Sequence, residues 1–319
     1  MSTRMTRAVG VTEYGGPDAL QVLDLPTTEC GPGQVRVQVA AAAINPTDTF
    51  VRNGARSNTG TPAGIADVPG MDVAGVLTEI GPGVDTGLQV DDRVVAVVVP
   101  KDEHGAYRED VVLPQGSVVA APAGHDDIAA ATLPMNAMTA RKTLDLLALE
   151  PGQVLAVTGS AGAYGGYVIQ LAKHEGLHVI ADAAEADEEL IRSLGADEIV
   201  RRGTDVAARI RERFPEGVDG LADGAVLDEH VLPAVKDGGA VATVRGYRGD
   251  GQRGLQVHPV WVFGIAEERE MLAGLSALAA DGTLTLRVAD AVAPAEAGQA
   301  HARLEAGGVR GRLVIDFSR

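Results

Sequence analysis

The chain has 319 residues, of which 44 are acidic and 27 are basic, giving a formal net charge of −17. Its length predicts two domains, and its composition of 45% hydrophobic and 22% charged residues is typical of a globular protein rather than a disordered one. The negative charge disfavours nucleic acid and an anionic membrane surface as partners, so we expect a small-molecule partner.

The single cysteine, Cys30, excludes an internal disulfide and any metal site that needs several thiolates. The first ten residues contain no apolar segment of signal-peptide length, and the longest apolar run, at 94–99, is too short to span a bilayer. These features predict a cytoplasmic protein without contact with a membrane.

Short strands predominate in the first 125 residues. Apolar and polar residues alternate at 35–39, 73–77 and 93–97, and turns rich in glycine and proline separate these stretches. This pattern predicts an antiparallel, barrel-like β domain.

From about residue 126, helices alternate with short apolar strands, which is typical of a parallel α/β sheet. The predicted order is helix 129–149, strand 154–158, a helix to about 175, strand 178–181, helix 187–194, strand 198–200, helix 206–214, strands 218–223 and 239–244, helix 267–280 and a last strand at 311–317.

A glycine-rich turn follows the predicted strand at 154–158. Its glycines recur every third residue, and because the chain has 40 glycines, that spacing alone is a weak signal. Here, however, strand, turn, helix and second strand form a complete βαβ unit, in which backbone N–H groups at a helix N-terminus can bind a pyrophosphate. The alternative is a tight turn without a ligand. The predicted cofactor-binding turn comprises Gly159, Ser160, Ala161, Gly162, Ala163, Tyr164 and Gly165.

Residues after the next two strands bear on the choice of nicotinamide cofactor. Asp182 is placed to bind a ribose 2′-hydroxyl, which favours NADH, although a capping role is the alternative. Arg201 and Arg202 end the third strand, where guanidinium groups would pair with a 2′-phosphate, unless both are simply solvated. We predict NADPH as the cofactor, with NADH as the alternative.

Seven further segments share their order and spacing with a known family. The chain resembles the zinc-independent quinone oxidoreductases of the medium-chain dehydrogenase/reductase superfamily. The matching segments are TEYGGP at 12–17, INPTDTFVR at 44–52, PGMDVAGV at 69–76, VDDRV at 90–94, GAYRE at 105–109, LGAD at 194–197 and LEAGGVRGR at 304–312.

The resemblance implies an α/β fold in two domains. A Rossmann dinucleotide-binding domain with a parallel doubly wound sheet is expected at 126–266, and a groES-like β-barrel domain at 1–125 and 267–319. The resemblance also implies a homodimer, formed by pairing strands of two nucleotide domains around residues 239–248.

The resemblance also addresses zinc. Zinc-bearing relatives carry a cysteine where this chain has Asn45 and a histidine where it has Met71, and neither an amide nor a thioether is a usual zinc ligand. The seven histidines are scattered without ligand spacing, so no metal is predicted. Without a Lewis acid, we expect hydride transfer to an acceptor activated by conjugation, either a quinone or another α,β-unsaturated carbonyl compound.

The remaining site residues are also implied by the resemblance. Asn45 is expected beside the nicotinamide ribose or substrate, with Asp48 orienting its neighbours; a turn role before Pro46 is the alternative for Asn45. Phe50 and Met71 are expected to contact the acceptor, although Phe50 fits a core position equally well, and solvent would supply the proton. Residues expected to contact the cofactor near the nicotinamide are Thr139, Val244, Gly246, Phe263 and Gly264.

The leading hypothesis is therefore an NADPH-dependent quinone or enone reductase. The main alternative is a non-catalytic NAD(P)-binding protein that senses redox state or binds a partner. A methyltransferase with a similar core is disfavoured, because of the spacing of the turn and because a β domain precedes it.

Overall fold

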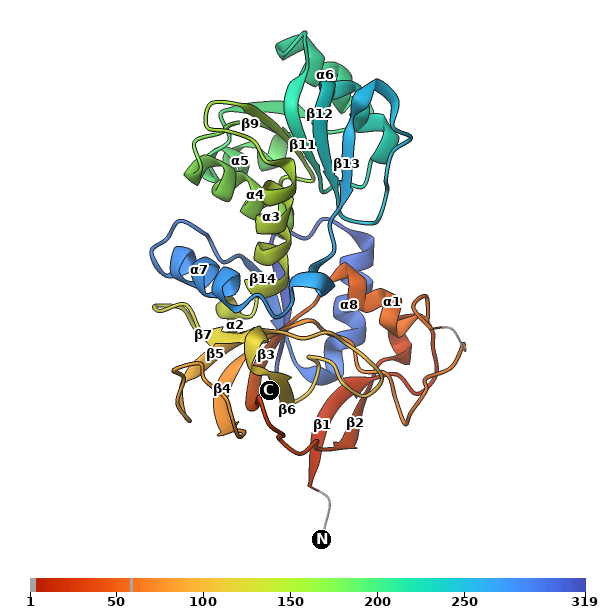
Figure 1. Ribbon diagram of the computed structural model, residues 1–319. Helices are drawn as coiled ribbons and strands as arrows, with labels where there is room; N and C mark the ends of the chain where they lie inside the picture. The colour runs from red at the N-terminus through yellow and green to blue at the C-terminus, as the bar shows by residue number, and fades with distance from the viewer. Residues whose placement is uncertain (1–3, 58–59) are drawn as a thin grey trace. The chain divides into compact units, whose positions relative to one another are not determined.

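The computed structural model describes residues 4–57 and 60–319, which fold as two compact units (Figure 1). The terminal unit combines Met1–Met135, Phe263–Ala280 and Leu286–Arg319. The central unit combines Asn136–Val262 and Asp281–Thr285. The sequence placed these divisions at 125/126 and 266/267.

A mostly antiparallel sheet forms the core of the terminal unit. Its central strand, β3 (Gln34–Ala43), pairs with β4 (Asp72–Ile80) and β6 (Asp110–Pro114) and, through residues 41–43, with β15 (Arg312–Asp316) from the end of the chain. Both ends of the chain therefore build one sheet. The remaining strands are β5 (Arg93–Val97), β7 (Val118–Ala120) and β14 (Val288–Val292), with β1 (Met5–Gly10) and β2 (Gln21–Pro26) forming a separate pair.

The described residues of the terminal unit form the α-helices α1 (Pro46–Arg52), α2 (Asp127–Ala130), α7 (Arg269–Ala280) and α8 (Ala297–Ala306). The predicted continuous helix at 129–149 is wrong, because residues 131–133 interrupt it and α3 (Pro134–Leu147) begins anew. Pro134 explains the break: proline has no N–H for a helical hydrogen bond, but it fits the first position of a helix.

The central unit is a six-stranded parallel sheet in the order β10-β9-β8-β11-β12-β13. The chain moves outward from β8 to β10 and then returns to β11, so the strand order reverses between β8 and β11. This reversal is the switch point at which doubly wound sheets bind ligands. The strands are β8 (Val154–Thr158), β9 (His178–Ala183), β10 (Glu198–Arg201), β11 (Val218–Asp223), β12 (Val235–Thr243) and β13 (Gln256–Pro259).

Helices of the central unit include α4 (Ala163–His174), α5 (Glu188–Ser193) and α6 (Val206–Arg213). The predicted fold class is confirmed, with a parallel α/β sheet in one unit and a largely antiparallel sheet in the other. Short 3-10 helices occur at Pro17–Ala19, Gln115–Ser117, Glu185–Asp187, Asp228–Ala234, Gln252–Gly254, Val262–Ile265 and Pro294–Glu296.

One expectation about assembly is corrected by the strand order. Residues 239–243 belong to β12, which is hydrogen-bonded to β11 on one side and to β13 on the other. Only an edge strand has unpaired backbone groups to offer a second chain, and the two edges of this sheet are β13, beside β12, and β10 at the far side. Strand pairing between two copies would therefore use one of these edges, and Gln256–Pro259 is the one that adjoins the predicted segment.

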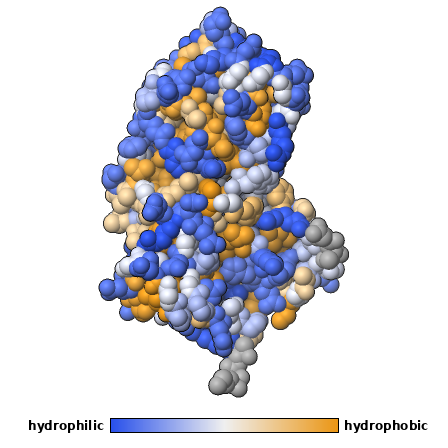
Figure 2. All heavy atoms as spheres, in the orientation of Figure 1, coloured by the Kyte–Doolittle hydropathy of each residue, from blue (hydrophilic) through white to orange (hydrophobic). Residues whose placement is uncertain are grey.

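The visible surface is largely hydrophilic, with smaller apolar areas between the charged side chains (Figure 2). None of the helices in residues 4–57 and 60–319 combines the length and apolar character needed to cross a bilayer.

Candidate functional site

The glycine-rich turn links β8 to α4 at the switch point of the parallel sheet. Gly159 has a φ of +66°, and a Cβ there would stand 2.6 Å from the backbone of Gly224. A Cβ on Gly165 would stand 2.6 Å from the carbonyl oxygen of Gly159. Both glycines are therefore needed for the chain to make this turn at all.

Gly162 has a different role, because its backbone would accept a side chain. Its φ of −71° and ψ of 167° are ordinary extended values, and a Cβ there would have one neighbour within 4 Å, the oxygen of Gly159 at 3.1 Å. The residue precedes the first turn of α4, whose N–H groups have no partners within the helix. The missing side chain thus leaves open the approach to a helix N-terminus, as a pyrophosphate requires.

Buried hydrogen bonds hold the turn in place. The Asp182 carboxylate accepts from the Ser160 N–H at 3.0 Å, and the Ser160 hydroxyl donates to the Val157 carbonyl at 2.9 Å. Burial raises the pKa of Asp182, and the N–H groups of Ser160 and Gly159 oppose that effect by favouring the carboxylate. These contacts give Asp182 a part in holding the turn, and its expected contact with a ribose stays a prediction.

Two arginines lie at the carboxyl edge of the sheet beside Asp182. Arg201 pairs with Ala183 in the strand register, and the Arg202 N–H donates to the Ala183 carbonyl at 2.9 Å. The Arg201 guanidinium lies 3.4 Å from Glu185, and both side chains are largely exposed. The Arg202 side chain is also exposed, at the edge where an adenosine ribose would lie.

Tyr164 packs against other parts of the central unit. Its hydroxyl lies 2.8 Å from the Thr143 hydroxyl on α3. Its ring lies 2.9 Å from the position that a Cβ on Gly224 would take. The side chain therefore reaches α3 and the segment after β11, while its backbone belongs to the first turn of α4.

The other predicted cofactor contacts are divided between the units. Thr139 lies on α3, and Val244 and Gly246 follow β12, all in the central unit. The Trp261 ring lies 3.0 Å from the position that a Cβ on Gly246 would take. Phe263 and Gly264 belong to the terminal unit, where the Arg56 guanidinium stacks 4.6 Å from the centre of the Phe263 ring.

A cavity of about 410 Å³ lies in the terminal unit, and Phe50 lines it together with Tyr14, Arg56 and Lys101. Met71 is absent from its wall. It is fully buried, and its sulfur accepts a hydrogen bond from the Thr47 hydroxyl at 3.3 Å. Of the two predicted acceptor contacts, Phe50 alone lines this cavity.

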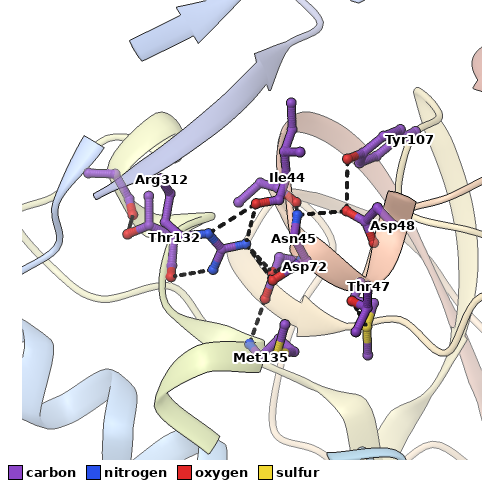
Figure 3. A network of polar contacts seen from close by, with 12 residues as sticks. Ile44, Asn45, Thr47, Asp48, Asp72, Tyr107, Thr132, Met135 and Arg312 are labelled. Atoms are coloured by element: carbon purple, nitrogen blue, oxygen red, sulfur yellow. Dashed lines mark hydrogen bonds and ion pairs between the residues drawn. The ribbon is translucent and has the colours of Figure 1, made fainter. Parts of the chain in front are cut away.

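Asn45 is the centre of a buried polar network (Figure 3). Its amide N–H donates to Asp72 at 2.8 Å, and its amide oxygen accepts from Arg312 at 2.7 Å. Arg312 also forms an ion pair with Asp72 at 2.9 Å, and the second Asp72 oxygen accepts from the Met135 N–H at 2.5 Å. Both ends of the Asn45 amide are engaged inside the unit, which favours an organising role over the direct contact expected from the sequence.

Asp48 adjoins this network, and none of the described residues forms an ion pair with it. One carboxylate oxygen accepts from the Asn45 N–H and from the Tyr107 hydroxyl, each at 2.8 Å. The other oxygen is buried and has no hydrogen-bond partner in the described parts of the chain. Burial raises the pKa of Asp48 to about 7, and its two hydrogen bonds only partly offset this effect.

This raised pKa predicts a stability that depends on pH. Because an unfolded aspartate titrates near pH ~4, the folded state binds the Asp48 proton more tightly, and stability falls as the pH rises from about 4 to about 7. The change Asp48→Asn removes this titration while keeping an oxygen that can accept both hydrogen bonds. We expect the unfolding free energy of the wild type, relative to D48N, to fall by about 1 kcal/mol or more between pH 5 and pH 8. Urea unfolding at both pH values checks this, and a difference that stays constant would contradict it.

Sequence reasoning missed several residues of the networks in the terminal unit. Asp72 and Arg312 each stand directly before a buried apolar stretch of their strand, and a charge in that position is a signal that could have marked them. Within the described residues, no group of three or more histidine, cysteine, aspartate or glutamate side chains could hold a metal ion.

The fold and the glycine-rich turn together define a class of protein. A doubly wound sheet with a glycine turn at its switch point, joined to a sheet built from both ends of the chain, is the architecture of two-domain dinucleotide-binding dehydrogenases. Comparison with known families agrees. Residues 31–123 match the alcohol dehydrogenase GroES-like domain, and residues 194–315 match the zinc-binding dehydrogenase family.

Individual proteins similar to this chain identify the family more closely. An NADPH-dependent alkenal/one oxidoreductase from Arabidopsis thaliana is 32% identical over 74% of this chain and 61% of its own length. A 2-haloacrylate reductase from Burkholderia sp. is 31% identical over 70% of this chain and 68% of its own length. The solved quinone oxidoreductase from Coxiella burnetii has a TM-score of 0.86 and 25% identity, covering 98% of this chain and 99% of that one.

The chain therefore belongs to the medium-chain dehydrogenase/reductase superfamily. It spans about three fifths of the length of the Arabidopsis relative.

Proposed function

We propose that the chain is an NADPH-dependent oxidoreductase that reduces a quinone or another α,β-unsaturated carbonyl compound without zinc. The observation that carries the proposal is the open approach at Gly162 to the N-terminus of α4, at the switch point of the sheet. The names of the relatives from Arabidopsis, Burkholderia and Coxiella support the same class of reaction.

The residues of the central unit fit the cofactor. Backbone N–H groups at the start of α4 would hold the pyrophosphate, in a turn that Asp182 and Ser160 keep rigid. Arg202, exposed beside the end of β9, would face a 2′-phosphate. When bound, the nicotinamide supplies the hydride.

The terminal unit would receive the acceptor. Phe50 and Tyr14 give the cavity an aromatic wall suited to a flat conjugated molecule. The resemblance places Asn45 and Met71 where zinc-bearing relatives carry zinc ligands, and an amide and a thioether suit zinc poorly. An acceptor that is already polarised by conjugation needs no Lewis acid, and we propose that solvent supplies the proton.

The test is loss of NADPH absorbance with a naphthoquinone and with a simple enone, measured with and without a zinc chelator. Turnover that the chelator leaves unchanged would support the proposal. Tight NADPH binding without turnover across a broad acceptor panel would overturn it and favour the non-catalytic redox-sensing alternative. Turnover that the chelator abolishes would overturn its zinc-independent part.

Arg202 gives a prediction about cofactor choice. The change Arg202→Ala should weaken NADPH binding about tenfold and NADH binding hardly at all, because a charge-assisted contact to the 2′-phosphate is lost only with NADPH. Arg201→Ala is the matched control: this guanidinium already faces Glu185, so we expect a smaller effect. Titration of cofactor fluorescence measures both dissociation constants. Equal losses for the two cofactors in R202A would remove Arg202 from the phosphate site.

The proposal includes a homodimer and a cytoplasmic location. Because β13 is an edge strand of the parallel sheet and adjoins β12, pairing of this strand between two copies is the arrangement that we propose. Light scattering on the purified chain measures the oligomeric state, and a monomer at micromolar concentration would contradict the dimer.

A further inference from the structure

Two charged residues on α1 belong to one ring of buried contacts. Asp48 and Arg52 are four residues apart, so their side chains lie on the same face of the helix. Tyr107 and His301 connect them from two other segments of the terminal unit. The order around the ring is Asp48, Tyr107, His301 and Arg52, and all four side chains are buried.

The chemistry of the four groups fixes the direction of every hydrogen bond. A guanidinium can only donate, so His301 Nδ1, 3.4 Å from Arg52, must accept. The imidazole proton therefore sits on Nε2, which lies 3.1 Å from the Tyr107 oxygen and donates to it. The Tyr107 hydroxyl then donates to Asp48 at 2.8 Å. The ring thus runs from a permanent cation to a carboxylate through a neutral histidine.

Other contacts support this form of the ring. Burial and the nearby Arg52 lower the pKa of His301 to about 4, which keeps the imidazole neutral. Its ring packs edge-on against Tyr107, with 5.8 Å between ring centres. Arg52 also binds Glu305 on α8 at 2.7 Å and the Gly15 carbonyl at 3.2 Å. Each end of α1 is therefore attached to the rest of the unit.

Helix α1 depends on such attachments. It has only seven residues, too few to be stable alone. Phe50 lies two positions from both Asp48 and Arg52, so it projects from a different face, and with Val51 it lines the 410 Å³ cavity. Any displacement of α1 would therefore move the aromatic wall of that cavity.

We propose that His301 is a positioning residue for the acceptor pocket: by closing the ring between Asp48 and Arg52, it holds α1, and with it Phe50, in the geometry that binds the acceptor. This inference rests on the proposed function, because it takes the cavity beside Phe50 as the acceptor pocket.

The test compares two replacements of His301 in the full chain. His301→Leu removes both ring contacts, whereas His301→Gln offers a carbonyl that can accept from Arg52 and an N–H that can donate to Tyr107. In H301L, we expect the KM for naphthoquinone to rise about fivefold or more, while the dissociation constant for NADPH stays within about twofold. In H301Q, most of the increase should disappear. Tyr107→Phe should match H301L, and the double variant Y107F/H301L should be no worse than either change alone.

Leu304→Ala is the matched control. Leu304 lies on the same helix as His301 and packs against the apolar core, so this change destabilises the unit without breaking the ring. We expect L304A to lower the melting temperature at least as much as H301L, with KM unchanged. Equal KM values in H301L and L304A, or no rescue in H301Q, would overturn the proposal.

A second readout does not depend on activity. Amide hydrogen exchange at residues 47–52 should be faster in H301L than in H301Q or L304A, because only H301L releases α1. If the wild type reduces no acceptor, the proposed function fails, and this measurement still decides whether His301 holds the helix. Equal exchange rates in all three variants would contradict the proposal that the ring holds α1 in place.

Discussion

Replacing Gly162 by valine is expected to weaken NADPH binding about 100-fold while leaving the fold intact. The backbone at Gly162 has ordinary dihedral angles, and the added Cβ meets only the Gly159 oxygen, at 3.1 Å. The rest of the side chain would occupy the space in front of the first turn of α4, where the pyrophosphate must approach. Losing two charge-assisted hydrogen bonds to the pyrophosphate accounts for a factor of this size.

Gly165→Val is the matched control for this change. A Cβ there would lie 2.6 Å from the Gly159 oxygen and 2.8 Å from Ser160 Cα, so we expect G165V to lose stability as well as binding. Cofactor titration and thermal unfolding together separate the two variants. A G162V protein that binds NADPH as tightly as the wild type would show that the phosphates do not approach this turn.

Local patterns were sufficient to predict several elements. The bounds of β5, β8 and β11 agree with the sequence, because each is a short, mostly apolar segment that ends at a turn. The helix α8 was missed. Its sequence begins Ala-Gly-Gln-Ala and contains one large apolar residue, Leu304, so it has almost no apolar face to detect.

The presence or absence of a local sequence pattern also explains which site residues could be predicted. The glycine turn is continuous in the chain, so strand, turn and helix could be recognised together. Arg312 contacts Asn45 across 267 positions, and Arg52 contacts His301 across 249. No local pattern indicates such pairs, because they form only when the C-terminal strand and helix pack beside the first half of the chain. Asn45 could thus be singled out by its motif, but its engagement with Arg312 and Asp72 could not.

Arg312 is the residue of that network whose loss should affect stability most. Replacing it by methionine is expected to lower the free energy of unfolding by about 3–5 kcal/mol, because Asp72 is left as an uncompensated charge in the core. The guanidinium is 4% exposed and donates to the Ile44 and Thr132 carbonyls as well as to Asn45 and Asp72. Urea unfolding measures the loss, and the exposed pair Arg303–Asp290 supplies a control, R303M, expected to cost less than about 1 kcal/mol.

A second substitution shows whether the buried charge of Asp72 causes the loss of stability in R312M. If the penalty arises from the stranded carboxylate, Asp72→Asn in the R312M background should recover part of the stability, although D72N alone is destabilising. The neutral amide can still accept from the Met135 N–H, which Asp72 binds at 2.5 Å. Strictly additive losses in the double variant would show instead that Arg312 acts through its packing and its carbonyl contacts. The connection between β15, β4 and the start of α3 would then not depend on charge.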